Sequence, residues 1–278
     1  MSSALLTTIA MVAFAGNSLL CRLALAETNI DPASFTSIRI ISGAATLALL
    51  GFLSSRRFTL EGSWFSAAAL FVYAAAFSFA YVDLSAGAGA LLLFGAVQTT
   101  MIAYGLFTGE RLSRVQTLGV VMAVIGLLIM FLPGVTAPPL LAGLMILGAG
   151  VAWGVYSLNG RATQNPMQAT AGNFVLAIPM VLLLQAAKWQ NATWDVTGSL
   201  YALASGALAS GAGYAIWYAV LPKLRATSAA TVQLTVPAIA AIGGVIFLAE
   251  PITSQLVVAS CAILGGVGLY IFSRSQET

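Results

Sequence analysis

The chain alternates between long uncharged stretches and short stretches that carry its ionisable residues. Between successive ionisable residues, uncharged runs cover residues 1–21, 40–55, 62–82, 84–109, 115–160, 162–187, 196–222, 226–249 and 251–273. A helix that crosses the hydrocarbon core of a bilayer needs about 20 mostly apolar residues. Eight of these runs hold one such helix each, and 115–160 holds two, separated by Pro and Gly residues. The run 40–55 is long enough only if Arg39 lies just inside its helix.

We therefore predict an all-α polytopic membrane protein with ten transmembrane helices. The predicted helices cover residues 4–25, 33–53, 62–82, 85–106, 114–131, 140–160, 167–187, 197–220, 226–247 and 252–272.

The composition supports this fold class. The chain is 60% hydrophobic and 7% charged, with a mean hydropathy of +0.97, whereas a soluble domain carries about 25% charged residues. A soluble α-solenoid is the alternative, but it needs a charged outer face that this composition does not supply. The net charge is only +3, and the basic residues are scattered between spans. We therefore expect the lipid bilayer as a partner and no nucleic acid.

Residue types exclude several kinds of chemistry. The chain has no histidine, which excludes histidine-dependent hydrolases, His-ligated haem and H-E-x-x-H zinc proteases. Cys21 and Cys261 both fall in predicted spans, with no disulfide or metal-ligand spacing. An intramembrane aspartyl protease would need two membrane aspartates, but Asp83 and Asp195 lie at predicted helix ends. We predict a protein that is not an enzyme and that needs no cofactor or metal.

The basic residues predict the orientation. Eight of the eleven lie in the even-numbered loops, at their edges or in the C-terminal tail: Arg56, Arg57, Arg111, Arg114, Arg161, Lys223, Arg225 and Arg274. Lys and Arg concentrate in cytoplasmic loops, so we expect both termini in the cytoplasm. No Lys or Arg precedes the first apolar stretch, so we do not expect a cleaved signal peptide.

The sequence also repeats itself. Residues 109–112 align with residues 249–252 at an offset of 140, and Arg22 aligns with Arg161 at an offset of 139. Further pairs at the offset of 140 are Ala86 with Ala226, Ala90 with Ala230 and Gly126 with Gly266. Because five helices are an odd number, the second repeat must enter the membrane inverted. We predict a first repeat over 1–132, a linker over 133–139 and an inverted second repeat over 140–278. Secondary transporters commonly have this architecture.

Several segments carry a family resemblance. They are Phe14-Ala15-Gly16-Asn17, Ser34–Arg39, Ala152–Tyr156, Tyr214–Ala219, Thr227–Ala230, Pro237 and Leu248–Thr253. With them the chain resembles the drug/metabolite transporter superfamily, specifically its ten-helix EamA branch. The first repeat departs from the pattern, since Val97 aligns with Pro237 and Phe14 stands where a Trp is common. The resemblance implies metabolite or drug export across a bacterial inner membrane. Within the family, the chain looks most like the YddG-type exporters of aromatic and other hydrophobic amino acids.

Polar and aromatic residues deep in the spans are the candidate substrate contacts, because such residues usually face the bundle interior or a cavity. The predicted substrate-binding residues are Phe14, Asn17, Gln98, Trp153, Tyr156, Tyr214, Trp217 and Gln233. Tyr73 and Phe77 mark one face of the third predicted helix. The alternative is that the aromatic rings face lipid or the membrane interface, and that the amides only join helices.

Four charged residues lie near the spans, and the two arginines among them have two interpretations. Arg22 and Arg39 can snorkel to the headgroups or pair with Glu27 and Asp31, or they can attract an anionic group such as a carboxylate. Glu110 and Glu250 occupy matching positions in the two repeats, where each is expected to cap the helix that follows it, the fifth or the tenth.

The predicted function is a secondary exporter of small molecules with an uncharged, aromatic-lined central cavity. A drug or nucleotide-sugar transporter of the same fold is the alternative, and a receptor or scaffold is a more remote one. The first helix has no acid before Glu27, so proton coupling through a carboxylate there is not expected. Uniport and exchange both remain open. The oligomeric state is not fixed by the sequence, which is compatible with a monomer.

Overall fold

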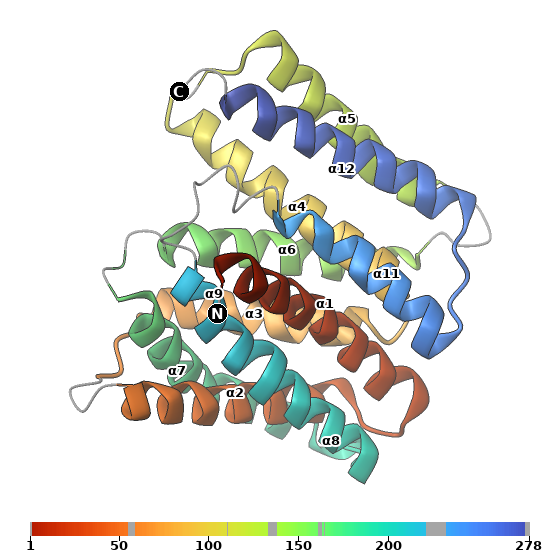
Figure 1. Ribbon diagram of the computed structural model, residues 1–278. Helices are drawn as coiled ribbons and strands as arrows, with labels where there is room; N and C mark the ends of the chain where they lie inside the picture. The colour runs from red at the N-terminus through yellow and green to blue at the C-terminus, as the bar shows by residue number, and fades with distance from the viewer. Residues whose placement is uncertain are drawn as a thin grey trace.

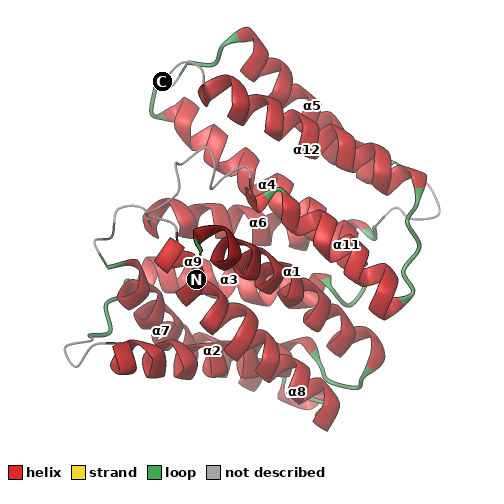
Figure 2. Cartoon of the chain, in the orientation of Figure 1, coloured by secondary structure: helices red, strands yellow, loops and turns green. Residues whose placement is uncertain are grey.

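The computed structural model describes residues 2–54, 59–109, 111–132, 138–160, 163, 165–220 and 232–275. Within these residues the ordered elements are all helices (Figure 1), and Figure 2 shows only loops between them. Nine long helices are α1 (Ser3–Glu27), α2 (Pro32–Ser54), α3 (Trp64–Ala80), α4 (Ala86–Phe107), α5 (Arg114–Met130), α6 (Leu140–Gly160), α7 (Pro166–Ala187), α11 (Thr235–Leu248) and α12 (Ser254–Ser275). The eighth span is a run of three pieces, α8 (Val196–Ala204), η2 (Ser205–Ala212) and α9 (Gly213–Val220), preceded by the short helix η1 (Trp189–Asn191). The all-α, ten-helix prediction is confirmed.

Three helices start close to their predicted positions, and a serine is the N-cap residue of each. Ser63 accepts the backbone N–H of Ser66 at the start of α3, and Ser85 accepts that of Ala88 at the start of α4. At α5, Ser113 and Gln116 form a reciprocal capping box. A side-chain oxygen at this position satisfies a backbone N–H that the helix leaves without a partner. Each of these helices starts within two residues of the predicted position.

The molecule is apolar outside and partly polar inside, as expected for a chain surrounded by lipid. Large apolar side chains are exposed along the helices, among them Leu53, Leu128, Leu183, Ile246 and Phe272. Polar and charged side chains such as Asn17, Arg39 and Gln98 are instead buried. Six helices are long and apolar enough to cross a membrane by themselves, and α3, α5 and α11 are shorter apolar helices. The chain is a multi-pass membrane protein.

The helix contacts show the inverted repeat. α2 packs against α7, α4 against α11 and α5 against α12, so these three helices each touch their counterpart in the other half. Other contacts also cross between the halves: α6 packs on α3 and α4, while α1 packs on the α8–η2–α9 run and α11. Figure 1 shows α5 and α12 side by side at one edge of the molecule, with α2, α7 and α8 at the opposite edge. The two five-helix halves are thus related by an approximate two-fold axis.

Glycine allows the closest of these helix crossings. A Cβ atom on Gly119 of α5 would lie 2.5 Å from the carbonyl oxygen of Gly266 on α12, and a Cβ on Gly266 would meet the Gly119 carbonyl in return. Gly126, which aligns with Gly266, faces Ile263 in the same interface. Small residues let two membrane helices approach until their backbones touch. The glycines therefore set the spacing of α5 and α12.

The repeat is also visible in the backbone where α4 and α11 end. Gly109 and Ala249, which align at the offset of 140, both adopt a positive φ, of 95° and 51°. The N–H of Glu250 then bonds the carbonyl of Gly244 at 3.1 Å. A left-handed residue commonly ends a helix, but a side chain in this conformation costs about 1–2 kcal/mol unless the residue is glycine. The second repeat thus keeps the turn with a strained alanine.

The eighth span differs from the single regular helix predicted over 197–220. Ser205–Ala212 is π-helical. Apart from Leu208, this segment consists of small residues, and it crosses α2 closely, since a Cβ on Gly206 would collide with the Arg39 carbonyl. A π-helical turn widens the helix by one residue and often marks a functional site. The sequence pattern contains no signal for this change.

Some predictions fall on residues outside the described ranges. They concern Arg56, Arg57, Glu110, Arg161, Lys223, Arg225, Thr227–Ala230 and most of the linker 133–139. The predicted helix 226–247 is described only from residue 232, and α11 begins at Thr235. The linker boundaries and the cytoplasmic position of both termini stay predictions.

Candidate functional site

Aromatic rings from both repeats meet at the centre of the bundle. Trp153 of α6 stacks on Tyr156, with centroids 5.3 Å apart and planes at 25°, and on Tyr214 of α9, at 5.3 Å and 29°. Its ring also lies 4.8 Å from that of Tyr73 on α3. Aromatic pairs attract one another at such distances. Trp153 is therefore the centre of an aromatic cluster that joins α3, α6 and α9.

The first helix completes this aromatic cluster. Phe14 of α1 meets Tyr214 edge-on at 5.6 Å and Trp217 at 5.9 Å. Phe174 of α7 lies edge-on to Tyr214 at 6.0 Å. The cluster thus contains five of the predicted site residues, contributed by α1, α6 and α9, and these helices belong to different repeats.

A polar network adjoins the aromatic cluster. The Asn17 side-chain amide donates to the Tyr73 hydroxyl at 3.2 Å and accepts from the Ser205 hydroxyl at 2.6 Å. The Arg39 guanidinium donates through Nη2 to the same Tyr73 hydroxyl at 2.9 Å, and through Nε to the Ser210 Oγ at 3.4 Å. Buried polar groups of this kind are costly unless they are hydrogen-bonded. The network holds α1, α2, α3 and η2 together at the wide π-helical turn.

The aromatic cluster also includes a buried hydroxyl pair. The Tyr156 phenol donates to the Thr170 hydroxyl of α7 at 3.3 Å. Both side chains are almost completely buried. Together with Asn17 and Tyr73, they give the cluster apolar faces and a few oriented polar groups, a combination that is typical of small-molecule sites.

Two predicted site residues have no described contact with the aromatic cluster. Gln98 is buried on α4, and Gln233 is half-buried just before α11. Among the described contacts, none links either amide to the aromatic cluster. For both residues, substrate contact stays a prediction.

Sequence reasoning missed Arg39, Ser205 and Ser210 as parts of this centre. Arg39 is the eighth residue of α2, about 10 Å from the helix start, and is only 1% exposed. Of its two interpretations, a place at the headgroups or a pair with Glu27 or Asp31 is wrong. The other interpretation, attraction of an anionic group such as a carboxylate, stays a prediction. The small residues of η2 let that segment close over the guanidinium. The presence of an arginine inside an apolar run was the available signal.

Asp31 pairs with neither Arg22 nor Arg39, the partners that one interpretation of the sequence offered. Its Oδ1 accepts the N–H groups of Ala33 and Ser34 at 2.9 and 3.0 Å, and its Oδ2 accepts that of Thr193 at 2.9 Å. The carboxylate therefore caps α2 and ties the loop before α2 to the loop before α8.

Arg22 forms a different ion pair from the one predicted. Its Nε lies 3.3 Å from Glu250 Oε1, and its Nη1 donates to the carbonyls of Tyr81 and Val82 at 3.0 and 2.6 Å. Both oxygens of Glu250 accept the N–H of Ala86, at 3.0 and 2.8 Å. Glu250 thus caps α4 of the first repeat. We had expected it to cap the tenth helix, and this is wrong. The left-handed turn at Ala249 directs the side chain across to α4.

The environment of Glu250 alters its ionisation. Burial raises the pKa of its carboxyl above the ordinary value, while the Ala86 N–H and Arg22 act in the opposite direction. The net rise means that the bonds to Ala86 and Arg22 do not fully replace the lost hydration. This contact joins α1 and α4 of the first repeat to the α11–α12 turn of the second.

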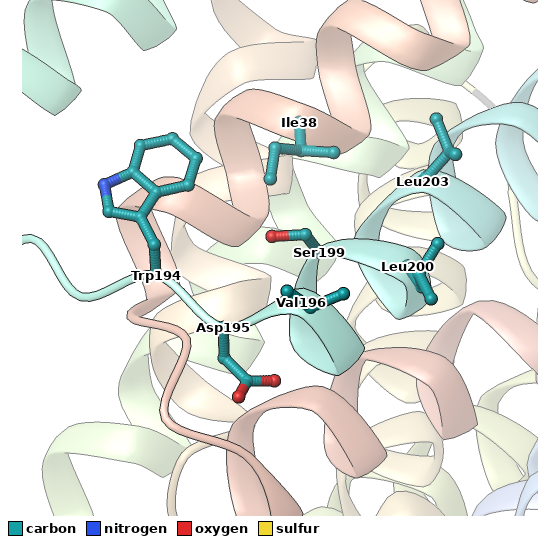
Figure 3. A pocket seen from close by; sticks show the side chains of 7 residues that line it. All are labelled: Ile38, Trp194, Asp195, Val196, Ser199, Leu200 and Leu203. Carbon is teal, nitrogen blue, oxygen red and sulfur yellow. The ribbon is translucent and has the colours of Figure 1, made fainter.

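A surface groove of about 430 Å³ lies apart from the aromatic cluster, between α2 and the start of α8. Figure 3 shows Ile38 on one side and Ser199, Leu200 and Leu203 on the other, with Trp194 at the entrance to α8. The Asp195 carboxylate beside it accepts the Gly198 N–H at 2.7 Å. Apart from Asp195 and Ser199, the groove is lined by apolar side chains, which suits an acyl chain of the surrounding lipid better than a polar substrate.

The chain is similar in sequence to known transporters. The sequence model of the EamA-like transporter family matches residues 1–132 and 140–272. The chain belongs to this family. Among its relatives, an uncharacterized Pseudomonas aeruginosa protein is 53% identical over 97% of this chain and 94% of its own length.

Other members of the EamA-like family carry a functional name. The threonine/homoserine exporter RhtA of Salmonella typhimurium is 31% identical over 60% of this chain and 57% of its own length. RhtA of Escherichia coli is 29% identical over 64% and 62%. A crystal structure with 17% identity matches 97% of this chain and 98% of its own with a TM-score of 0.67, which supports the fold.

Proposed function

We propose that this chain is a secondary exporter that moves amino acids, including aromatic and hydrophobic ones, across the bacterial inner membrane by alternating access. The observation that carries the proposal is the aromatic cluster around Trp153, because it is built by helices of both repeats. In transporters with inverted repeats, the substrate site lies near the midplane between the repeats, and rocking opens it to each side in turn.

The chemistry of the centre fits such a substrate. The faces of Trp153 and Tyr214 can stack on an aromatic or aliphatic side chain. The hydroxyl of Tyr73 and the amide of Asn17 can bond the polar groups of an amino acid. The names of the RhtA relatives point to the same substrate class.

The test is counterflow in proteoliposomes. The purified chain is reconstituted with one unlabelled amino acid inside, and uptake of labelled phenylalanine, tryptophan, threonine or homoserine is followed. We expect saturable uptake that exceeds that of empty liposomes for at least one of these amino acids. Counterflow of only cationic drugs or nucleotide sugars would replace the amino acid assignment by another substrate of the same fold. No counterflow of any class would favour a receptor or scaffold.

The orientation is tested separately. Single cysteines introduced at Arg56 and Lys223 should react only from the cytoplasm, and those at Asn29 and Asn191 only from the periplasm. If Asn29 and Arg56 react from the same side, the proposed topology is wrong.

A further inference from the structure

Arg39 is a buried cation whose hydrogen bonds are incomplete. A guanidinium has five N–H donors and no acceptor. Nη2 donates to the Tyr73 hydroxyl and Nε to Ser210 Oγ, but Nη1 is buried and has no hydrogen-bond partner among the described residues. Buried polar atoms without a partner are rare, because each loses its hydration without replacement. One edge of this guanidinium is thus free to bind a further acceptor.

In the described part of the chain, the charge of Arg39 is also without a counterion. The ion pair found among the described residues joins Arg22 to Glu250 and does not involve Arg39. The described carboxylates near helices lie at their ends, as Asp31 and Asp195 do when they cap α2 and α8. A buried charge normally has a partner of opposite sign, since desolvation is otherwise too costly.

Aromatic rings replace only part of the missing anion. The Arg39 Cζ lies 4.9 Å from the centre of the Phe77 ring and 5.1 Å from that of Tyr73. Cation–π contacts stabilise a guanidinium, but less than a bidentate carboxylate does. If Arg39 served only to join α2 to α3 and η2, a neutral donor such as glutamine could make the same bonds without burying a charge.

The position of Arg39 connects it to the aromatic cluster. Tyr73 accepts the Arg39 bond through its hydroxyl, and the ring of the same residue lies 4.8 Å from that of Trp153. Asn17 donates to the same hydroxyl. A molecule with one anionic group and one apolar group could therefore reach the guanidinium and the stacked rings together.

We propose that Arg39 is the carboxylate anchor of the transport site, and that the exported substrates are small molecules with a free carboxylate and an apolar part. The inference rests on the proposed transport function and specifies its substrate class. The carboxylate supplies the missing counterion and accepts from Nη1, while the apolar part packs on the Trp153 aromatic cluster. Amides, amines and neutral sugars lack the group that this site requires.

The first experiment measures binding and does not depend on transport. The Tm of the detergent-purified protein is recorded with phenylacetate and with phenylacetamide, which differ in the anionic group. We expect phenylacetate to raise the Tm in a saturable way and to bind at least about tenfold more tightly than the amide, since hydrogen bonds to a charged group are the stronger ones. Equal shifts with the two compounds, or no shift with either, would overturn the anchor.

Variants of Arg39 place the effect at this residue. Arg39→Gln keeps two donors without the charge and should lose the preference for phenylacetate. Arg39→Lys keeps the charge but loses the planar fork, so an intermediate preference is expected. Arg22→Gln is the matched control, because it removes a cation that already has its own carboxylate. It should keep the wild-type preference.

A second variant is informative even if Arg39→Gln does not fold. Ser210→Asp places a carboxylate beside Arg39 Nε and so supplies an internal counterion. The phenylacetate shift should disappear, because the guanidinium is then already paired. If Ser210→Asp or Arg39→Gln folds and still prefers phenylacetate as the wild type does, the anchor lies elsewhere.

Transport then separates this inference from the proposed function. Counterflow of labelled phenylalanine is compared with that of phenylalanine amide, and Arg39→Gln should lower the ratio of the two by about 10- to 100-fold. If Arg39→Gln loses the phenylacetate shift but keeps wild-type counterflow of amino acids, the anchor alone is overturned. An Arg39-dependent phenylacetate shift without any amino acid counterflow overturns the amino acid assignment and leaves the anion site standing.

Discussion

Replacing Trp153 by alanine tests whether the aromatic cluster is the transport site. Trp153 lies 4.8 Å from Tyr73 and 5.3 Å from both Tyr156 and Tyr214. Each aromatic pair contributes about 0.5–1.5 kcal/mol beyond its buried area. Loss of three pairs, together with the cavity left behind, should cost about 3–5 kcal/mol of stability, as for other large aromatic truncations. We expect a clearly lower Tm but a protein that still inserts.

The effect on transport should depend on the substrate. An aromatic amino acid loses one stacking partner in Trp153→Ala, which is worth about 2- to 10-fold in affinity, whereas threonine or homoserine has no ring to lose. The assay is counterflow of labelled tryptophan and threonine by the same proteoliposome preparations. Trp189→Ala is the matched control, because this tryptophan is 71% exposed in the short helix before α8.

Two results would refute this reasoning. An equal loss for tryptophan and threonine would mean that Trp153 has only a packing role. Unchanged transport of both substrates by a normally folded variant would place the substrate path outside the aromatic cluster, and the site assignment would fail with it.

Four further predictions concern the frame around the site. Gly266→Ala should lower the Tm, because its Cβ would strike the Gly119 carbonyl, whereas Gly265→Ala, which faces open space in the same helix, should leave the Tm unchanged or raise it slightly. Ala249→Gly should stabilise the protein by about 1 kcal/mol in thermal unfolding, because the residue has a φ of 51°, and a lower Tm would contradict the strain argument. Glu250→Gln should mainly lower the folded yield, and it would be a coupling residue instead if the variant folded normally but lost only proton-driven uptake. Because burial raises the pKa of Glu250, wild-type stability should fall as the pH rises through that pKa, and the glutamine variant, titrated alongside, should lack this component.

The sequence could predict the helices because lipid imposes a simple requirement on them. Each span must be long, apolar and closed by caps, and Ser63, Ser85 and Ser113 mark the starts at positions that local chemistry alone explains. The repeat was also readable, since identical turns at Gly109 and Ala249 need similar residues around them.

The candidate site was only partly predictable. Large aromatic residues in mid-span, such as Trp153 and Tyr214, are conspicuous in any apolar sequence. Ser205 and Ser210 are not, because a serine in a helix gains its role only from what the neighbouring helix brings to it. The placement of Glu250 was wrong because local reasoning assigns a carboxylate to its nearest helix, whereas the left-handed turn directs it to α4, far away in the sequence.

The π-helical segment η2 has a consequence for the resting state expected of the empty protein. Two inverted halves with identical structures would open to either side of the membrane at equal free energy. A two-fold rotation that exchanges the halves would convert one open state into the other. Here α3 is a regular α-helix over Trp64–Ala80, whereas its counterpart changes register over Ser205–Ala212. Under the proposed alternating access, we therefore expect the two orientations to differ in free energy, so that the empty protein prefers one of them even without a gradient.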